Sequence, residues 1–100
     1  MHIHNVFFWL KEGLDPESSK LFEEGLASLT KIPEVASGSF GKPAETERPV
    51  IDNTYDYGLI LIFESIAAHD QYQDGVIHLE FLAKHAAKWG KVQVYDIETL

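Results

Sequence analysis

The sequence predicts a small α+β protomer that pairs with a second copy of itself through its sheet. Two segments, residues 3–11 (IHNVFFWLK) and 55–64 (YDYGLILIFE), would carry apolar side chains on both faces as strands. Helical patterns and weaker strand patterns separate and follow them, which gives the order β-α-β-β-α-β. With 100 residues the chain forms one domain, residues 1–100.

Segment 55–64 contains the longest apolar run of the chain. As a strand, it would direct one set of side chains to one face: Tyr57, Leu59, Leu61 and Phe63. A buried helix is the competing interpretation of a short apolar run, but the isoleucines, aromatic residues and glycine favour a strand. Segment 3–11 alternates in the same way, with His4, Val6, Phe8 and Leu10 on one face.

The first helix is predicted to begin at Asp15-Pro16-Glu17, where an N-cap acceptor precedes a proline and an acidic residue. Its apolar stripe consists of Leu14, Leu21, Phe22, Leu26 and Leu29. Gly25 lies on that stripe and is expected to leave space beneath the helix, which ends before Pro33. Residues 35–44 form a weak edge strand, because they contain two glycines and a proline, and 45–54 a loop.

After segment 55–64, Ser65 can cap a short helix over 66–73, which Asp74-Gly75 interrupts. A second helix is expected over 77–89, with one side formed by His78, Phe81, Leu82, His85 and Trp89. Gly90 is expected to end it. Residues 91–98 (KVQVYDIE) alternate and predict a half-exposed last strand.

This order predicts a ferredoxin-like protomer with an antiparallel sheet. We expect right-handed crossovers to place segments 3–11 and 55–64 side by side and parallel at the centre, with the other strands at the edges. Helices would cover one sheet face, and the other would carry Ile3, Phe7, Trp9, Ile60 and Ile62. Exposed apolar patches of this kind mark interfaces, so we expect a homodimer in which two sheets enclose an α/β barrel.

Composition limits the possible partners. Sixteen acidic and eight basic residues give a formal charge of −8, which argues against binding to nucleic acid. No apolar run is long enough to span a membrane, and the N-terminus lacks the pattern of a signal peptide. There is no cysteine, which excludes disulfides and thiolate chemistry and fits a cytoplasmic location.

Several segments together resemble the stress-responsive dimeric α/β-barrel (Dabb) family: IHNVFFWLKEGLDPE, KIPEV, YDYGLILIFES, DQYQDGVIH and KWGKVQVYDI. The resemblance implies a homodimer of ferredoxin-like protomers. The chain more distantly resembles olivetolic acid cyclase, a cofactor-free member of this family with a pocket between sheet and helices. That resemblance implies that Tyr72 and His78 carry proton chemistry and that His4 borders the pocket. Gly75-Val76 replaces a common His-Pro, and small Gly25 and Ala27 replace a bulky aromatic, so a different substrate is expected.

The expected pocket is lined by apolar residues of both central strands and the helices: Val6, Phe8, Phe22, Leu59, Leu61, Phe81 and Trp89. Tyr72 and His78 flank the break between two helices and can project above the sheet. A neutral imidazole can take a proton next to a carbonyl, while a phenol hydrogen-bonds the developing enolate. The alternative is that His78 braces the turn and Tyr72 belongs to the core edge.

Two further histidine patterns have alternatives. His2 and His4 share a strand face and could hold a metal, but no carboxylate or cysteine completes a motif in the sequence, so no metal is expected. His85 could be a haem ligand, but a packed histidine is expected instead, and no cofactor is predicted. The predicted function is binding of a small apolar or carbonyl-containing molecule. The alternative is a cofactor-independent cyclase, isomerase or lyase.

Overall fold

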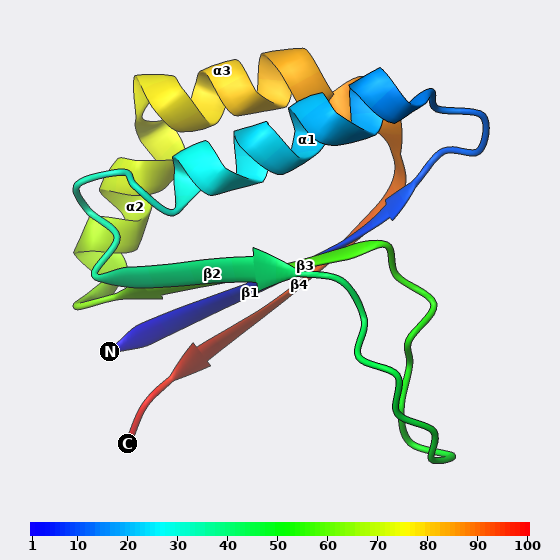
Figure 1. The fold of residues 1–100 in the computed structure, drawn as a ribbon. Helices are drawn as coiled ribbons and strands as arrows, with labels where there is room; N and C mark the ends of the chain where they lie inside the picture. Colours follow the sequence, from blue (N-terminus) through cyan, green and yellow to red (C-terminus); the bar gives the residue numbers. More distant parts are fainter.

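The computed structural model describes residues 1–100 as a four-stranded sheet with all helices on one side (Figure 1). The elements, in chain order, are β1 His2–Leu10, α1 Pro16–Leu29, β2 Ser37–Gly41, β3 Tyr57–Phe63, α2 Ile66–Asp74, α3 Val76–His85, a 3₁₀ turn Ala86–Lys88 and β4 Trp89–Glu98. The strand order is β2-β3-β1-β4. This confirms the ferredoxin-like α+β fold, with the two most apolar strands at the centre.

The direction of the central pair differs from the prediction. β1 and β3 are antiparallel, with His4 opposite Leu61, and β1 and β4 are antiparallel, with His4 opposite Asp96. The expectation of a parallel central pair was therefore wrong. Each helical crossover skips a strand: α1 joins β1 to β2 with β3 between them, and α2 and α3 join β3 to β4 around β1. The crossover rule thus relates strands two places apart, not neighbours.

Both predicted N-caps are present. The Asp15 carboxylate accepts a hydrogen bond from the Ser18 amide at 2.7 Å, and the Ser65 hydroxyl accepts one from the Ala68 amide at 3.1 Å. The predicted helix over 77–89 is shorter in the structure, because α3 ends at His85. Trp89 and Gly90 belong to β4, where Trp89 pairs with Leu10. Trp89 still lies near Phe81, with ring centroids 6.1 Å apart. The two rings have the sequence spacing of one helix face, but Trp89 reaches Phe81 from the strand that follows the helix.

The main core lies between the sheet and the helices. Its fully buried members include Phe22, Leu26 and Leu29 from α1 and Leu59, Leu61 and Phe63 from β3. The space expected under Gly25 is filled by His85, because a Cβ at position 25 would lie only 2.6 Å from His85 Nε2. Gly25 therefore allows α3 to approach α1 closely.

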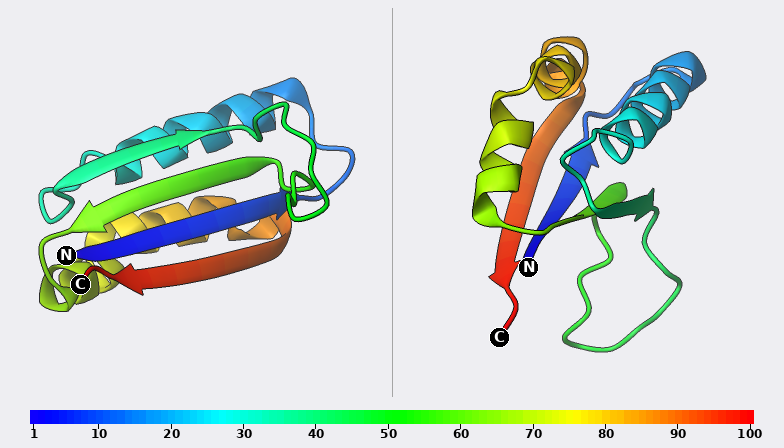
Figure 2. Two further views of the ribbon diagram at one scale, coloured as in Figure 1. Left: turned by 90° about the horizontal axis from the view of Figure 1, so that it is seen from below. Right: turned by 90° about the vertical axis from the view of Figure 1, so that its left-hand side faces the viewer.

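The opposite face of the sheet has no helix over it (Figure 2). Ile3, Phe7, Trp9 and Ile62 are half-buried there, and Ile60 is 43% exposed. The loop over 42–56 projects from this side and shields one end of it. Within the loop, the Tyr55 ring lies 4.9 Å from that of Phe7, and Thr54 Oγ1 accepts a hydrogen bond from Trp9 Nε1 at 2.9 Å. None of the helices is long and apolar enough to cross a membrane.

Candidate small-molecule site

A cavity of about 220 Å³ lies between the sheet and the helices. Its apolar wall comes from three strands and two helices, and consists of Val6, Phe8, Leu29, Leu59, Phe81, Leu82, Trp89, Val92 and Val94. Four polar residues complete the lining: His4, Tyr72, Gln73 and His78. The cavity exists because α3 packs against α1 rather than over β4, which leaves Val92 and Val94 partly uncovered, each 41% exposed.

Most of the residues assigned to a pocket from the sequence meet here. Tyr72, His78 and His4 border the cavity together with Val6, Phe8, Leu59, Phe81 and Trp89. Phe22 and Leu61 do not border it. They lie deeper in the core, where the Phe22 ring packs 5.2 Å from Phe8 and 5.4 Å from Tyr57.

Sequence reasoning did not assign Leu29, Gln73, Leu82, Val92 or Val94 to the pocket. For the two valines a signal existed, since they alternate on β4 and face the same way as His4. Val94 pairs with Val6, and Val92 with Phe8. Once β4 is placed beside β1, this register assigns both valines to the helix-covered side.

Tyr72 is buried at the end of α2, beside His78, with ring centroids 4.8 Å apart. Burial raises the pKa of its phenol well above the usual value. The hydroxyl has no hydrogen-bond partner in the protein. It is also not fully buried, because His2 Nε2 is the only side-chain nitrogen or oxygen that is both fully buried and unpaired. A neutral phenol in this position is a free hydrogen-bond donor at the cavity.

His78 is oriented by the break between α2 and α3. Its Nδ1 lies 3.0 Å from the backbone carbonyl oxygen of Gln73. A carbonyl can only accept, so Nδ1 carries the proton and Nε2 retains the lone pair. Burial lowers the pKa of His78, and the neighbouring His69 lowers it further, although the bond to Gln73 acts in the opposite direction. The result is a neutral imidazole whose free nitrogen can accept a proton.

His4 borders the same cavity from β1, farther from the phenol, with its ring centroid 6.2 Å from that of Tyr72. Its Nδ1 lies 2.6 Å from Asp96 Oδ1 on the neighbouring strand. Burial lowers the pKa of His4 even though Asp96 favours the protonated form. The cavity therefore has one neutral phenol and two imidazoles whose charged forms are disfavoured.

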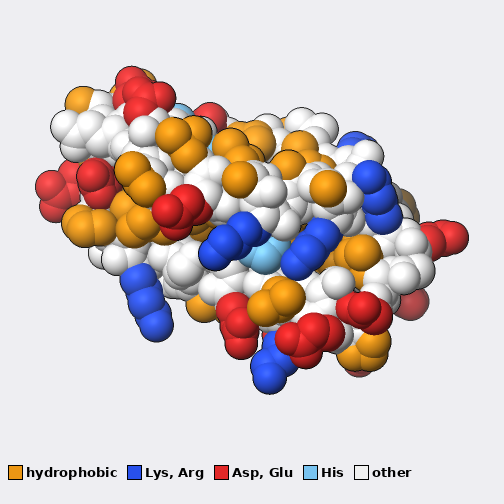
Figure 3. Space-filling view, turned by 90° about the horizontal axis from the view of Figure 1, so that it is seen from above, with side chains coloured by type: hydrophobic (Ala, Val, Ile, Leu, Met, Phe, Trp, Pro, Cys, Tyr) orange, Lys and Arg blue, Asp and Glu red, His pale blue; other side chains and the backbone are white.

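His85 lies away from this cavity. It lines an open groove of about 670 Å³ between α1 and α3, on the surface that the helices form (Figure 3). Its ring packs against Phe81 and Phe22, with centroid distances of 5.0 and 5.6 Å, and its Nδ1 lies 3.1 Å from Lys88 Nζ. The ammonium donates, so His85 Nδ1 accepts. His85 thus joins the two helices beside Gly25.

The structure defines a class of protein: a ferredoxin-like α+β domain with one helix-covered sheet face, one bare face and a small cavity on the covered side. The chain matches the model of the stress responsive A/B barrel domain (Dabb) over residues 3–99, and it belongs to this family. The family resemblance predicted from the sequence is thereby confirmed.

Solved structures of the same fold cover nearly the whole chain. The Arabidopsis thaliana protein At3g17210 is 24% identical, with 100% of this chain and 96% of that chain covered and a TM-score of 0.83. A Dabb family protein from Mesorhizobium loti is 25% identical, with 99% and 96% covered and a TM-score of 0.79. Hydroxynitrile lyase from Passiflora edulis is 19% identical, with 96% and 90% covered and a TM-score of 0.79. Two others are described as dimeric ferredoxin-like proteins of unknown function. A search of curated proteins finds no match.

Proposed function

We propose that this protein is a homodimer that binds a compact, mainly apolar carbonyl compound in the cavity beside Tyr72 and His78. One observation carries the proposal. The neutral phenol of Tyr72, which has no partner in the protein, and the neutral imidazole of His78 border a mainly apolar cavity, with ring centroids 4.8 Å apart. A ligand carbonyl oxygen would accept a hydrogen bond from Tyr72, while the apolar part of the ligand contacts Phe8, Phe81 and Val94.

The size of the cavity limits the ligand. Pockets for drug-sized molecules are typically about 300–1,000 Å³, and this cavity has about 220 Å³. Because that volume corresponds to roughly seven water molecules, a single-ring aldehyde or ketone is a suitable size. Few polar groups in an apolar wall fix the orientation of a ligand rather than supply most of its affinity.

Dimer formation is supported by the bare face of the sheet. Ile3, Phe7, Trp9, Ile60 and Ile62 lie on this face of two neighbouring strands, around Asn5, and similar structures are described as dimeric. The same face of a second protomer would cover this surface and exclude water from it. The cavity lies on the other side of the sheet, so each protomer would carry its own site.

The second candidate is a cofactor-independent cyclase, isomerase or lyase, and the tautomer of His78 favours it. His78 Nε2 would remove a proton from the carbon next to a bound carbonyl. The C–H electron pair would form the C=C bond of an enolate, whose oxygen accepts a hydrogen bond from Tyr72. Return of the proton to the same or another carbon completes exchange or isomerisation. In Passiflora edulis a hydroxynitrile lyase has this fold, so the scaffold is compatible with an enzyme.

Acetophenone is a suitable probe, because it has one ring, one carbonyl and exchangeable α-protons. We expect it to shift the amide NMR signals of residues around the cavity. Tyr72→Phe should weaken binding about 3- to 10-fold, the effect of one hydrogen bond, whereas His85→Gln, a matched histidine change outside the cavity, should leave it unchanged. No cavity-specific shift with acetophenone, or equal affinity in Tyr72→Phe, would refute the binding proposal.

Exchange of the α-protons of acetophenone for deuterium in heavy water separates the two candidates. An enzyme should accelerate this exchange, and His78→Ala should reduce the rate by about 100- to 10,000-fold, with little change in melting temperature. Saturable binding without accelerated exchange would support the first candidate, a binding protein. It would also exclude His78 as a base toward acetophenone.

A further inference from the structure

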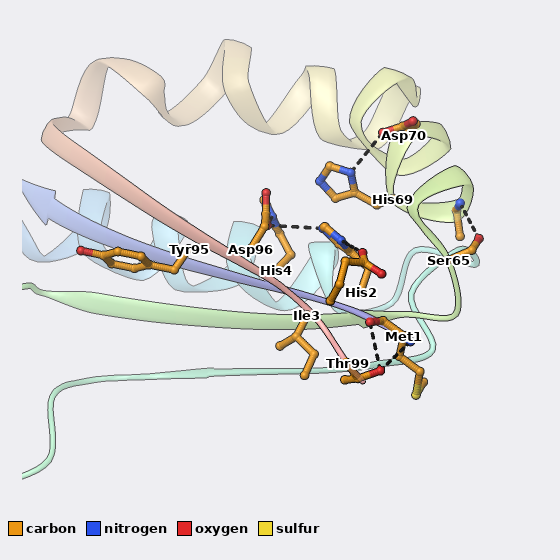
Figure 4. A network of polar contacts seen from close by, with 12 residues as sticks. Met1, His2, Ile3, His4, Ser65, His69, Asp70, Tyr95, Asp96 and Thr99 are labelled. Carbon is orange, nitrogen blue, oxygen red and sulfur yellow. Dashed lines mark hydrogen bonds and ion pairs between the residues drawn. The ribbon is translucent and has the colours of Figure 1, made fainter.

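A second cluster of ionisable side chains lies at the end of the sheet where both chain termini meet (Figure 4). His2 and His4 project from β1 toward the helices, because they are two residues apart on a strand. Their partners on β4 are Glu98 and Asp96, in the register that pairs His2 with Glu98 and His4 with Asp96. His69 approaches from α2, with its ring centroid 4.5 Å from that of His2 and 4.8 Å from that of His4.

One nitrogen in this cluster is buried without a hydrogen bond. His2 is only 6% exposed, and its Nε2 is the one fully buried side-chain nitrogen or oxygen of the chain that lacks a partner. Its other ring nitrogen, Nδ1, lies 2.6 Å from Glu98 Oε1. The carboxylate accepts there, so the proton of a neutral His2 is on Nδ1 and the lone pair is on Nε2. The same nitrogen lies 3.4 Å from Asp96 Oδ1, which is also an acceptor.

His2 Nε2 is buried, whereas the Asp96 side chain is 41% exposed. A proton or a cation between two acceptors this close would stabilise both. No lysine or arginine supplies it, since the ion pairs of Asp96 and Glu98 are with histidines alone. Four ligand atoms, one each from His2, His4, His69 and Asp96, lie within 4.8 Å of one another. In a tetrahedral zinc site with bonds of about 2.0–2.1 Å, ligand atoms are about 3.3–3.4 Å apart. The pair His2 Nε2 and Asp96 Oδ1 already has this spacing.

The donor set indicates the class of ion. Three imidazoles and one carboxylate suit divalent transition ions of the zinc type, whereas magnesium and calcium prefer oxygen ligands. Glu98 matches the common arrangement in which a carboxylate accepts the second N–H of a ligating histidine and fixes its tautomer. His69 completes the set from α2, where its side chain is only 14% exposed. Its Nδ1 lies 3.2 Å from Asp70 Oδ1 and its Nε2 3.2 Å from Gln73 Nε2, so one of these contacts is exchanged for the ion.

We propose that His2, His4, His69 and Asp96 bind one divalent transition ion per chain, with Glu98 orienting His2. The ion would replace the proton between His4 and Asp96, and it would connect the start of β1, the end of β4 and α2. Because His4 also borders the small-molecule cavity, the ion would lie next to the cavity wall. The site does not depend on the proposed ligand, and it can be tested without one.

The test uses the full chain without a polyhistidine tag, treated with EDTA and then titrated with zinc chloride by calorimetry. We expect one zinc ion per chain and a higher melting temperature with zinc than with magnesium. Cobalt(II) in place of zinc should give the intense visible absorption of a tetrahedral site. His69→Ala and Asp96→Asn should each weaken zinc binding at least 10-fold, and Glu98→Gln by about 10- to 100-fold.

His85→Gln serves as the control, because it removes a buried histidine far from the cluster and should leave zinc affinity unchanged. Circular dichroism of each variant in EDTA shows whether the apo protein is folded. His69→Gln keeps a polar side chain on the helix surface and provides a second variant if His69→Ala does not fold. Absence of zinc binding by the folded wild-type protein, or equal affinity in the folded His69 and Asp96 variants, would overturn the proposal. The cluster would then be an imidazolium–carboxylate network only.

Discussion

The two faces of the sheet have similar side chains but different surroundings. On the covered face, Leu59, Leu61 and Phe63 of β3 are almost fully buried under the helices. On the other face Ile62 is half-buried and Ile60 is 43% exposed, although both are equally apolar. Alternation along one strand therefore does not tell which face the chain itself covers. The chain itself covers one face with helices and leaves the other without one, and on that second face we expect the partner protomer.

A charge on the bare face should give the largest effect. Ile60→Asp would place an unpaired carboxylate inside an apolar interface, at a cost of several kcal/mol. We therefore expect the dissociation constant of the dimer to rise by at least about 100-fold. Light scattering after size exclusion should show twice the chain mass for the wild type and the mass of one chain for the variant.

The matched control for this change is Val76→Asp, since Val76 is 69% exposed at the start of α3, on the helix-covered side of the sheet. It introduces the same charge and should remain dimeric. A wild type that is monomeric at micromolar concentration, or an Ile60→Asp variant that is still dimeric, would contradict the assignment of the bare face as the interface.

Alanine substitutions at two neighbouring residues of β3 compare the contributions of the two faces to stability without adding a charge. Leu61→Ala removes a fully buried side chain and should lower the free energy of unfolding by about 2–5 kcal/mol. Ile62→Ala, one residue along on the bare face, should cost less at low protein concentration, because a monomer leaves this side chain half-exposed. Urea unfolding at two protein concentrations measures both. Equal costs that do not depend on concentration would show that Ile62 gains nothing from a partner.

The smallest expected effect is a pH dependence of stability that belongs to the covered side. Burial lowers the pKa of His85, and the nearby Lys88 and Lys84 lower it further. Just below the ordinary pKa of about 6.5, the unfolded chain then binds more protons at this position than the folded chain. Stability contributed by neutral His85 is therefore complete above about pH 6.5 and is lost as the pH falls toward the lower folded pKa.

His85→Gln removes this titration and keeps an acceptor for Lys88. The melting temperature of the variant should fall less than that of the wild type between pH 7 and pH 5. His4 and His78 also have lowered pKa values, so the variant should retain part of the acid sensitivity. If the melting temperature of His85→Gln depends on pH as strongly as that of the wild type, His85 is protonated without a loss of stability in the folded protein.

Local chemistry made much of the fold predictable. Asp15 and Ser65 are N-caps, the two most apolar segments are the central strands, and the glycine-containing segment with Phe40 is the edge strand β2. Each of these follows from the residue itself or its immediate neighbours. Strand direction did not follow, because it depends on which strand each crossover skips.

The candidate sites show the same limit. The spacing of Tyr72 and His78 across a helix break was visible in the sequence, and the structure brings both to one cavity. The partners of His2 and His4 were not visible, because His69 and Asp96 are more than sixty residues away and arrive through the β1–β4 register and the position of α2. Gly25 suggested an empty space, yet the ring that fills this space comes from α3.

The meeting of the chain ends has a practical consequence for preparing this protein. The amino group of Met1 lies 2.8 Å from Thr99 Oγ1, so both termini leave the domain at the same corner, next to His2 and Glu98. A polyhistidine tag attached at either terminus would compete for the same metal ions as the native side chains. Purification with a removable or histidine-free tag is therefore needed to show whether metal measured in the purified protein is bound by the domain or by the tag.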